Sequence, residues 1–253
     1  MVAFKKVFFS FVFMLLCMFS LVSKAESLTI LSAGAVEPGL VKVVEDFEKK
    51  TGHKVSIQFG TSPQLSQKLS SNVVADVLVA PVSVMQDQIS AGRVIQTNPP
   101  VIGKVGAGIT VRNALTSPAV ASVEEFKQTL LQSESIVYNT ASTGVYLDKL
   151  FEKMGISEQL KPKTQKFANG DMVLTHIING KGKEIGFGAI PEIKMYETKG
   201  LRLVGPLPAE IQNYTSYAAA VMKATSNEKI ASDLFSYITQ ASNRHFYKDA
   251  GID

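Results

Sequence analysis

Three successive units at the start of the chain each place a short apolar run before a loop of small residues and a segment with helical spacing of apolar residues. The three runs are residues 28–31, 55–59 and 76–80. Short runs rich in β-branched residues indicate strands, whereas apolar residues three and four apart, as in residues 36–50, indicate an amphipathic helix. This alternation predicts a mostly parallel sheet with helices on its faces.

A second α/β set follows a proline-rich break at residues 98–100. Its predicted strands are residues 135–138 and 184–189, and its predicted helices are residues 123–132, 145–154 and 171–179. The chain then closes with a predicted strand at residues 215–222 and an amphipathic helix at residues 227–240.

Two strands are predicted to connect two lobes. Residues 104–112 form the first crossing, and residues 215–222 form the return crossing. We therefore predict an α/β clamp in which each lobe is a mostly parallel sheet flanked by helices. Lobe one is predicted to comprise residues 26–103 and 216–253, and lobe two residues 104–215.

The first 25 residues have the pattern of a secretory signal peptide. Lys5 and Lys6 lead into an apolar run, residues 7–22, which ends at Ser23-Lys24-Ala25. We predict cleavage before Glu26, because small residues stand at the positions that signal peptidase reads. A transmembrane anchor is the alternative, but the run is shorter than the roughly 20 apolar residues that span a bilayer.

The cysteine and charge content of the mature chain narrows its location and partners. Cys17 is the one cysteine and lies in the apolar run, so the mature chain has no disulfide, which favours a bacterial periplasm. Removal of three lysines with the signal leaves 23 of the 26 basic residues against 22 acidic ones, and no basic patch predicts a nucleic-acid partner. His53, His176 and His245 are isolated, so we expect no metal site, and no motif indicates a cofactor.

Four predicted loops at strand ends share small or hydroxyl-bearing residues. Ligands bind at such loops in open α/β sheets, and the helices that follow present N–H groups that attract anions. Ordinary turn and helix-cap chemistry is the alternative explanation, because it uses the same residue types. The residues predicted to hold a polar or anionic ligand are Ser32, Ala33, Gly34, Gly60, Thr61, Ser62, Ala80, Ser142, Thr143 and Gly144.

Seven short segments together carry a family resemblance. They are residues 28–35, 47–52, 59–62, 75–77, 143–146, 184–187 and 247–252. In these segments the chain resembles the periplasmic molybdate-binding proteins of ABC importers and the wider type II solute-binding family. The resemblance implies a soluble periplasmic-binding-protein-like clamp that captures a small oxyanion and delivers it to a membrane permease. We expect the clamp to be a monomer, with Ser32, Thr61 or Ser62, and Ala80 contacting the ligand from lobe one and the Thr143 amide from lobe two.

The chain also departs from the molybdate pattern. Molybdate binders commonly place a tyrosine soon after the strand that here includes Phe187, and Gly188 and Ala189 stand there instead. Ala189 therefore joins the candidate ligand-binding residues. Ser142 and Thr143 replace the proline and alanine of the lobe-two loop. A wider cleft with more hydroxyls suits an organic carboxylate, so both a molybdate-like oxyanion and an organic acid stay open.

An enzyme on the same scaffold is the main alternative. Some aconitate isomerases resemble this exported family, and moving a proton next to a carboxylate requires an acid or base in the cleft. The candidate residues are Glu37, Tyr146, Asp171 and Glu192, although a helix dipole also favours acidic residues in its first turn. Of the arginines, Arg112 is the candidate to face the cleft and pair with a carboxylate, and the alternative, which we favour, is that it is a solvated surface arginine.

A third class, a structural or adhesive exported protein, is disfavoured. The chain has no internal repeats and no low-complexity stalk.

Overall fold

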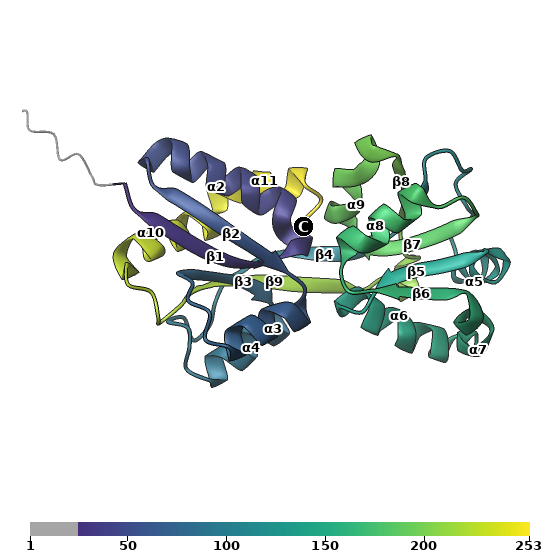
Figure 1. Cartoon of the computed structure of the whole chain (residues 1–253), viewed down its shortest axis with the longest axis horizontal. Coiled ribbons are helices and arrows are strands. Elements are labelled where there is room, and N and C mark those ends of the chain that lie inside the picture. The colour runs from purple at the N-terminus through teal and green to yellow at the C-terminus, as the bar shows by residue number, and fades with distance from the viewer. Residues whose placement is uncertain (1–24) are drawn as a thin grey trace, which may run out of the picture.

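The computed structural model describes residues 25–253, so the predicted signal peptide, apart from Ala25, lies outside the described residues. Two α/β lobes lie side by side and are joined by two long strands (Figure 1). Within residues 25–253, none of the helices is both long and apolar enough to span a membrane.

Lobe one is built on a sheet with the strand order β2, β1, β3, β9, β4. Its strands are β1 (Ser27–Ala33), β2 (Lys54–Gly60), β3 (Val77–Pro81), β9 (Tyr214–Val221) and the first half of β4 (Val101–Arg112). β1 is parallel to β2 and β3, whereas β9 is antiparallel to both β3 and β4. Figure 1 shows α2 (Glu37–Thr51), α10 (Glu228–Thr239) and α11 (Arg244–Asp249) on one face, and α3 (Ser62–Ser70) and α4 (Val82–Ser90) on the other.

Helix α2 illustrates how the sequence fixes these elements. Pro38 lies in its first turn, where a missing N–H removes no helical hydrogen bond. Leu40, Val43 and Phe47 recur at helical spacing and are buried in the lobe-one core. Gly52 has a φ of 76° and ends the helix, because a left-handed residue is most easily a glycine.

Lobe two contains the second half of β4 together with β5 (Ser135–Asn139), β6 (Thr164–Phe167), β7 (Glu184–Ala189) and β8 (Leu201–Pro206). β5 is parallel to β6 and β7, and β4 is antiparallel to β7 and β8. Its helices are α5 (Val123–Gln132), α6 (Ser142–Lys153), α7 (Ser157–Leu160), α8 (Gly170–Asn179) and α9 (Ile190–Tyr196). Short 3-10 turns complete the chain: η1 (Gly34–Val36), η2 (Lys161–Lys163), η3 (Glu197–Lys199), η4 (Ala209–Ile211) and η5 (Ala241–Asn243).

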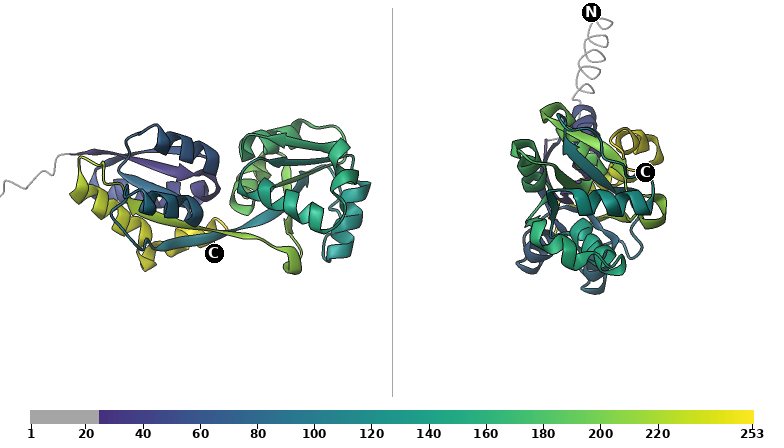
Figure 2. Two further views of the ribbon diagram at one scale, coloured as in Figure 1. Left: turned by 90° about the horizontal axis from the view of Figure 1, so that it is seen from below. Right: turned by 90° about the vertical axis from the view of Figure 1, so that its right-hand side faces the viewer.

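β4 and β9 run between the lobes side by side (Figure 2). β4 pairs with β9 from Val101 to Gly106, and from Ala107 onward it pairs with β7. A single strand therefore belongs to both sheets. The crossing strands contribute to both lobes, so pairing alone does not give a single residue at which one lobe ends. The lobe boundaries after residue 103 and before residue 216 therefore stay predictions.

Each lobe has its own buried hydrophobic cluster. In lobe one the cluster includes Leu28, Phe47 and Leu234. In lobe two Phe126 packs edge-on against Phe187, with ring centroids 5.9 Å apart. Separate cores joined by two strands form the architecture in which lobes move as rigid bodies about a hinge.

The structure differs from the sequence-based expectations at several elements. Helix α6 begins at Ser142, three residues before its predicted start. Helix α9 was not predicted, and Pro191 lies in its first turn, where proline is favoured. Strand β6 was not predicted, because its sequence TQKF is mostly polar and its residues are only half-buried or exposed.

Candidate functional site

The two lobes and both crossing strands line a cleft of about 200 Å³. At about 30 Å³ for each water in the liquid, this volume corresponds to roughly six or seven water molecules, which suits a small ligand. The lining residues come from both lobes and from both crossing strands: Ala33, Gly34, Ala35, Glu37, Phe59, Gly60, Thr61, Ser62, Gln64, Val105, Gly106, Ala107, Asn139, Ala141, Ser142, Thr143, Asn169, Gly170, Asp171, Ala189, Glu192, Asn213, Thr215 and Tyr217. None of these described lining residues is Lys, Arg or His.

The N-termini of α3 and α6 meet on one side of the cleft. Thr61 caps α3, and its own N–H donates to the Gln64 side chain at 2.8 Å. Ala141 precedes α6 and offers no side-chain cap, so the first N–H groups of this helix have no capping acceptor. The Oγ atoms of Ser62 and Ser142 lie 3.2 Å apart and share a hydrogen bond between the lobes. Two helix N-termini with adjacent hydroxyls form a site that attracts an anion.

The opposite side of the cleft holds Glu192, in the first turn of α9. Its carboxyl group lies between Gly34 of lobe one and Gly170 of lobe two. A Cβ added at Gly34 would lie 3.1 Å from Glu192 Oε1, and a Cβ added at Gly170 would lie 3.0 Å from Glu192 Cδ and overlap Oε2. The two glycines therefore leave the space that this carboxyl group occupies.

Two further carboxyl groups, Glu37 and Asp171, share this side of the cleft. Burial raises the pKa of Glu192 to about 7, and the charges of Glu37 and Asp171 add to the rise. A hydrogen bond from the Ala189 backbone acts in the opposite direction and lowers the pKa. Burial and the charge of Asp171 also raise the pKa of Glu37. Burial followed by the charge of Glu192 raises the pKa of Tyr217. Near neutral pH, Glu192 is therefore divided between its charged and neutral forms.

Most residues predicted to hold ligand lie in this lining. They are Ala33, Gly34, Gly60, Thr61, Ser62, Ser142, Thr143 and Ala189. The structure does not bring Ser32, Ala80 or Gly144 into the lining. Ser32 and Ala80 are fully buried in strands, and the Ser32 hydroxyl donates to Ala33 O at 3.1 Å. Gly144 lies against Asn139, and its absent side chain makes room for that backbone.

The candidate acid–base residues separate in the same way. Glu37, Asp171 and Glu192 line the cleft. Tyr146 lies outside the lining, and its hydroxyl donates to Ile211 O at 2.6 Å. The candidate placement of Arg112 in the cleft is wrong, because it ends β4 in lobe two and lies 3.6 Å from Glu184.

Sequence reasoning missed several polar lining residues, among them Asn139, Asn169 and Tyr217. Asn169 caps α8 by accepting the Met172 N–H at 2.9 Å, and an asparagine before a helical pattern is a recognisable cap signal. Asn139 accepts the Ala141 N–H at 2.9 Å and so shapes the loop before α6. Tyr217 lies on the return crossing, and no local pattern places it beside Glu192.

The chain is similar to several known proteins. The sequence profile of bacterial extracellular solute-binding proteins matches residues 28–253. An aconitate isomerase of Pseudomonas sp is 26% identical over 232 residues, covering 89% of this chain and 87% of that protein.

Solved structures with the same fold include the periplasmic molybdate-binding protein of Azotobacter vinelandii, with a TM-score of 0.73 and 16% identity over 89% of this chain and 98% of that one. The sulfate-binding protein SubI of Mycobacterium tuberculosis H37Rv has a TM-score of 0.67 and 18% identity over 90% and 86% of the two chains. These likenesses confirm the predicted α/β fold class.

Proposed function

Because the chain belongs to the bacterial extracellular solute-binding protein family of ABC-type importers, we propose that it captures a small organic carboxylate in the interlobe cleft. The family resemblance predicted from the sequence is thereby confirmed. Proteins of this family are periplasmic and pass small ligands to membrane permeases. For this chain we propose cleavage before Glu26, a periplasmic location and the lobe division at residues 103 and 216.

The observation that carries the proposal is the polarity of the cleft. On the α3–α6 side, Ser62, Ser142 and Thr143 offer hydroxyls and helix N-terminal amides. Hydrogen bonds of this kind to a charged group contribute about 1.5–3 kcal/mol each. The site can therefore hold a carboxylate without a basic side chain.

The acidic side of the cleft favours an extended organic acid over a compact ion. A tetrahedral dianion filling the cleft would meet the carboxyl groups of Glu37, Asp171 and Glu192. A longer ligand places its carboxylate against α3 and α6 and leaves a less charged part against Glu192. A molybdate-like oxyanion is the alternative ligand, so both kinds of ligand belong in the same binding experiment.

A thermal-shift screen of the chain from Glu26 tests the ligand class. The panel contains molybdate, tungstate, sulfate, phosphate, citrate, cis-aconitate and trans-aconitate. A ligand at 100 times its Kd adds about 2.7 kcal/mol, which raises the Tm by roughly 5–10 °C for a chain of this size. Stabilisation by organic acids supports the proposal, and stabilisation by molybdate and tungstate alone contradicts it.

A matched pair of variants locates the site. Thr143→Asp adds a carboxylate to the lining at the first turn of α6, which should repel an anion and remove the ligand-induced shift. Thr140→Asp adds the same charge at an exposed position outside the lining and should keep the shift. Equal behaviour of the two variants would place the site elsewhere.

Isomerisation of a tricarboxylate is the second candidate function. It is favoured by the carboxyl groups in the cleft and by the 26% identity to an aconitate isomerase. The reaction removes a proton from the CH2 carbon next to the double bond and adds one to the former vinyl carbon, so a single acid–base group suffices. Turnover of cis- to trans-aconitate with deuterium uptake from D2O would support it, and no turnover at enzyme concentrations near that of substrate would exclude it.

A further inference from the structure

We propose that Glu192 selects the ligand by taking up a proton as the lobes close and donating it in a hydrogen bond to a ligand oxygen. The cleft would then capture an anion together with a proton. This inference rests on the proposed capture of an organic carboxylate and adds which residue reads the ligand.

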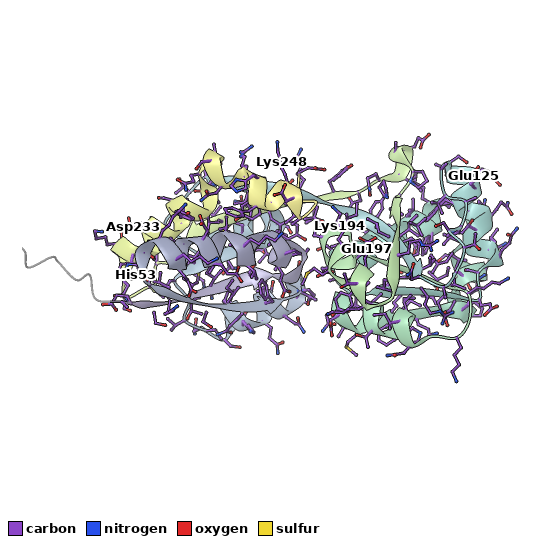
Figure 3. All side chains as sticks on the ribbon, turned by 90° about the horizontal axis from the view of Figure 1, so that it is seen from above. His53, Glu125, Lys194, Glu197, Asp233 and Lys248 are labelled. Atoms are coloured by element: carbon purple, nitrogen blue, oxygen red, sulfur yellow. The ribbon has the colours of Figure 1, made fainter. Side chains whose placement is uncertain are left out.

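The position of Glu192 links the two lobes. The side chain starts from α9 of lobe two and its carboxyl group reaches Gly34 of lobe one, where an added Cβ would lie 3.1 Å from Oε1. Helix α9 also packs against η1 and α2 of lobe one. Lys194, two residues further along α9, reaches across the same boundary (Figure 3), with Nζ 3.3 Å from where a Cβ on Gly251 would lie. Closure of the lobes therefore removes water from around Glu192.

The charges around Glu192 also change on closure. Glu37 faces it from α2 of lobe one, and Asp171 faces it from α8 of lobe two. Tyr217 faces it from β9, and its pKa is raised in turn by Glu192. The positive charge of Lys199 lowers the pKa of Glu37 and so opposes the rise that burial and Asp171 cause there. Because Glu37 comes from the other lobe, closure brings like charges together, and a proton on Glu192 relieves the repulsion.

The pKa of Glu192 supports this geometry. In this structure, where the Ser62 and Ser142 hydroxyls meet across the cleft, burial raises the pKa of Glu192 from the ordinary 4.5 to about 7. A neutral carboxyl group can donate a hydrogen bond, whereas a carboxylate can only accept. A neutral Glu192 therefore favours a ligand with an accepting oxygen, and a charged Glu192 repels the same ligand.

The sign of the pH dependence follows from linkage. We assign the raised pKa to the closed clamp, because the two lobes touch at Ser62 and Ser142. Closure then takes up a proton between pH 4.5 and about 7, and this contribution is lost as the pH rises through about 7. With the ordinary glutamate value of 4.5 taken for the open state, a closed-state pKa of about 7 predicts that affinity falls about 30-fold between pH 5.5 and pH 8.

Calorimetric titration of citrate or trans-aconitate at pH 5.5 and pH 8 tests the inference with three proteins. Glu192→Gln keeps a neutral donor at every pH, so its affinity relative to wild type should rise about 30-fold from pH 5.5 to pH 8. The ligand itself also titrates over this pH range, but its titration affects both proteins equally. The ratio of the two affinities therefore reports only on residue 192. Glu210→Gln removes the same charge from an exposed position outside the lining and should follow wild type.

The possible outcomes distinguish a wrong role for Glu192 from a wrong ligand class. If wild type binds the acids but Glu192→Gln shows the same pH dependence, the role of Glu192 is overturned and the proposed function survives. If no organic acid binds any of the three proteins at either pH, the proposed function itself fails. If Glu192→Gln binds neither acid at either pH while its far-UV circular dichroism and Tm match wild type, Glu192 acts as an acceptor and the inference is also overturned.

Discussion

Replacement of Gly144 by alanine tests how the α6 side of the cleft is built. A Cβ at this position would overlap Asn139 O and lie 2.8 Å from Asn139 C and 3.0 Å from Tyr138 Cδ2. The first two are backbone atoms at the end of β5, so the first turn of α6 must shift by more than 1 Å to restore a normal contact. Overpacking of this kind costs about 1–3 kcal/mol or more, against about 1 kcal/mol gained in helix propensity.

We therefore expect Gly144→Ala to lower the free energy of unfolding by about 2 kcal/mol, which lowers the Tm by roughly 4–8 °C. It should also weaken ligand binding, because Ser142 and Thr143 move with the turn. The matched control is Gly188→Ala in β7, where the added Cβ would meet Ile193 Cγ1 at an ordinary 3.7 Å. Urea and thermal denaturation measure both variants, and equal stability of the two would refute the reasoning.

Two further variants test contacts inside and outside the cleft. Arg112→Ala should leave organic-acid affinity unchanged within about twofold but lower the free energy of unfolding by about 2 kcal/mol, because it leaves the buried Glu184 without its ion-pair partner. Loss of affinity at unchanged stability would instead place Arg112 in the binding site. Ser62→Ala and Ser142→Ala, alone and combined, should show a coupling of about 0.5–1.5 kcal/mol in ligand affinity, because their hydroxyls bond to each other across the cleft. Strictly additive effects in calorimetric titrations would show that this contact does not contribute to closure.

Local patterns were sufficient to predict many of the helices and strands and most of the loops that line the cleft. The helical spacing of Leu40, Val43 and Phe47 and the stop at Gly52 follow from side-chain periodicity and backbone sterics, which are local properties. The loops at Gly60 and Ser142 were found because a strand followed by small residues and a helix places its loop at the ligand edge of the sheet.

The direction of individual side chains was beyond local reasoning. Ser32 lies one residue before the lining residue Ala33, yet its side chain is in the core. Successive residues in a strand point to opposite faces, and the loop pattern does not say which residue is the last to face inward. Arg112 was misplaced because β4 continues to the far end of lobe two. The meeting of Glu192 with Glu37 depends on how two lobes pack, which no short segment encodes.

The place of β9 in the sheet has a consequence for the order of folding. Val77 of β3 pairs with Val221 of β9, and β9 separates β3 from β4 in the lobe-one sheet. One internal strand of the lobe-one sheet is thus synthesised only after the helices and other strands of lobe two. Contacts so distant in sequence form slowly, because a long loop must be closed before they contribute. The nascent chain therefore cannot complete its first sheet until β9 has been synthesised.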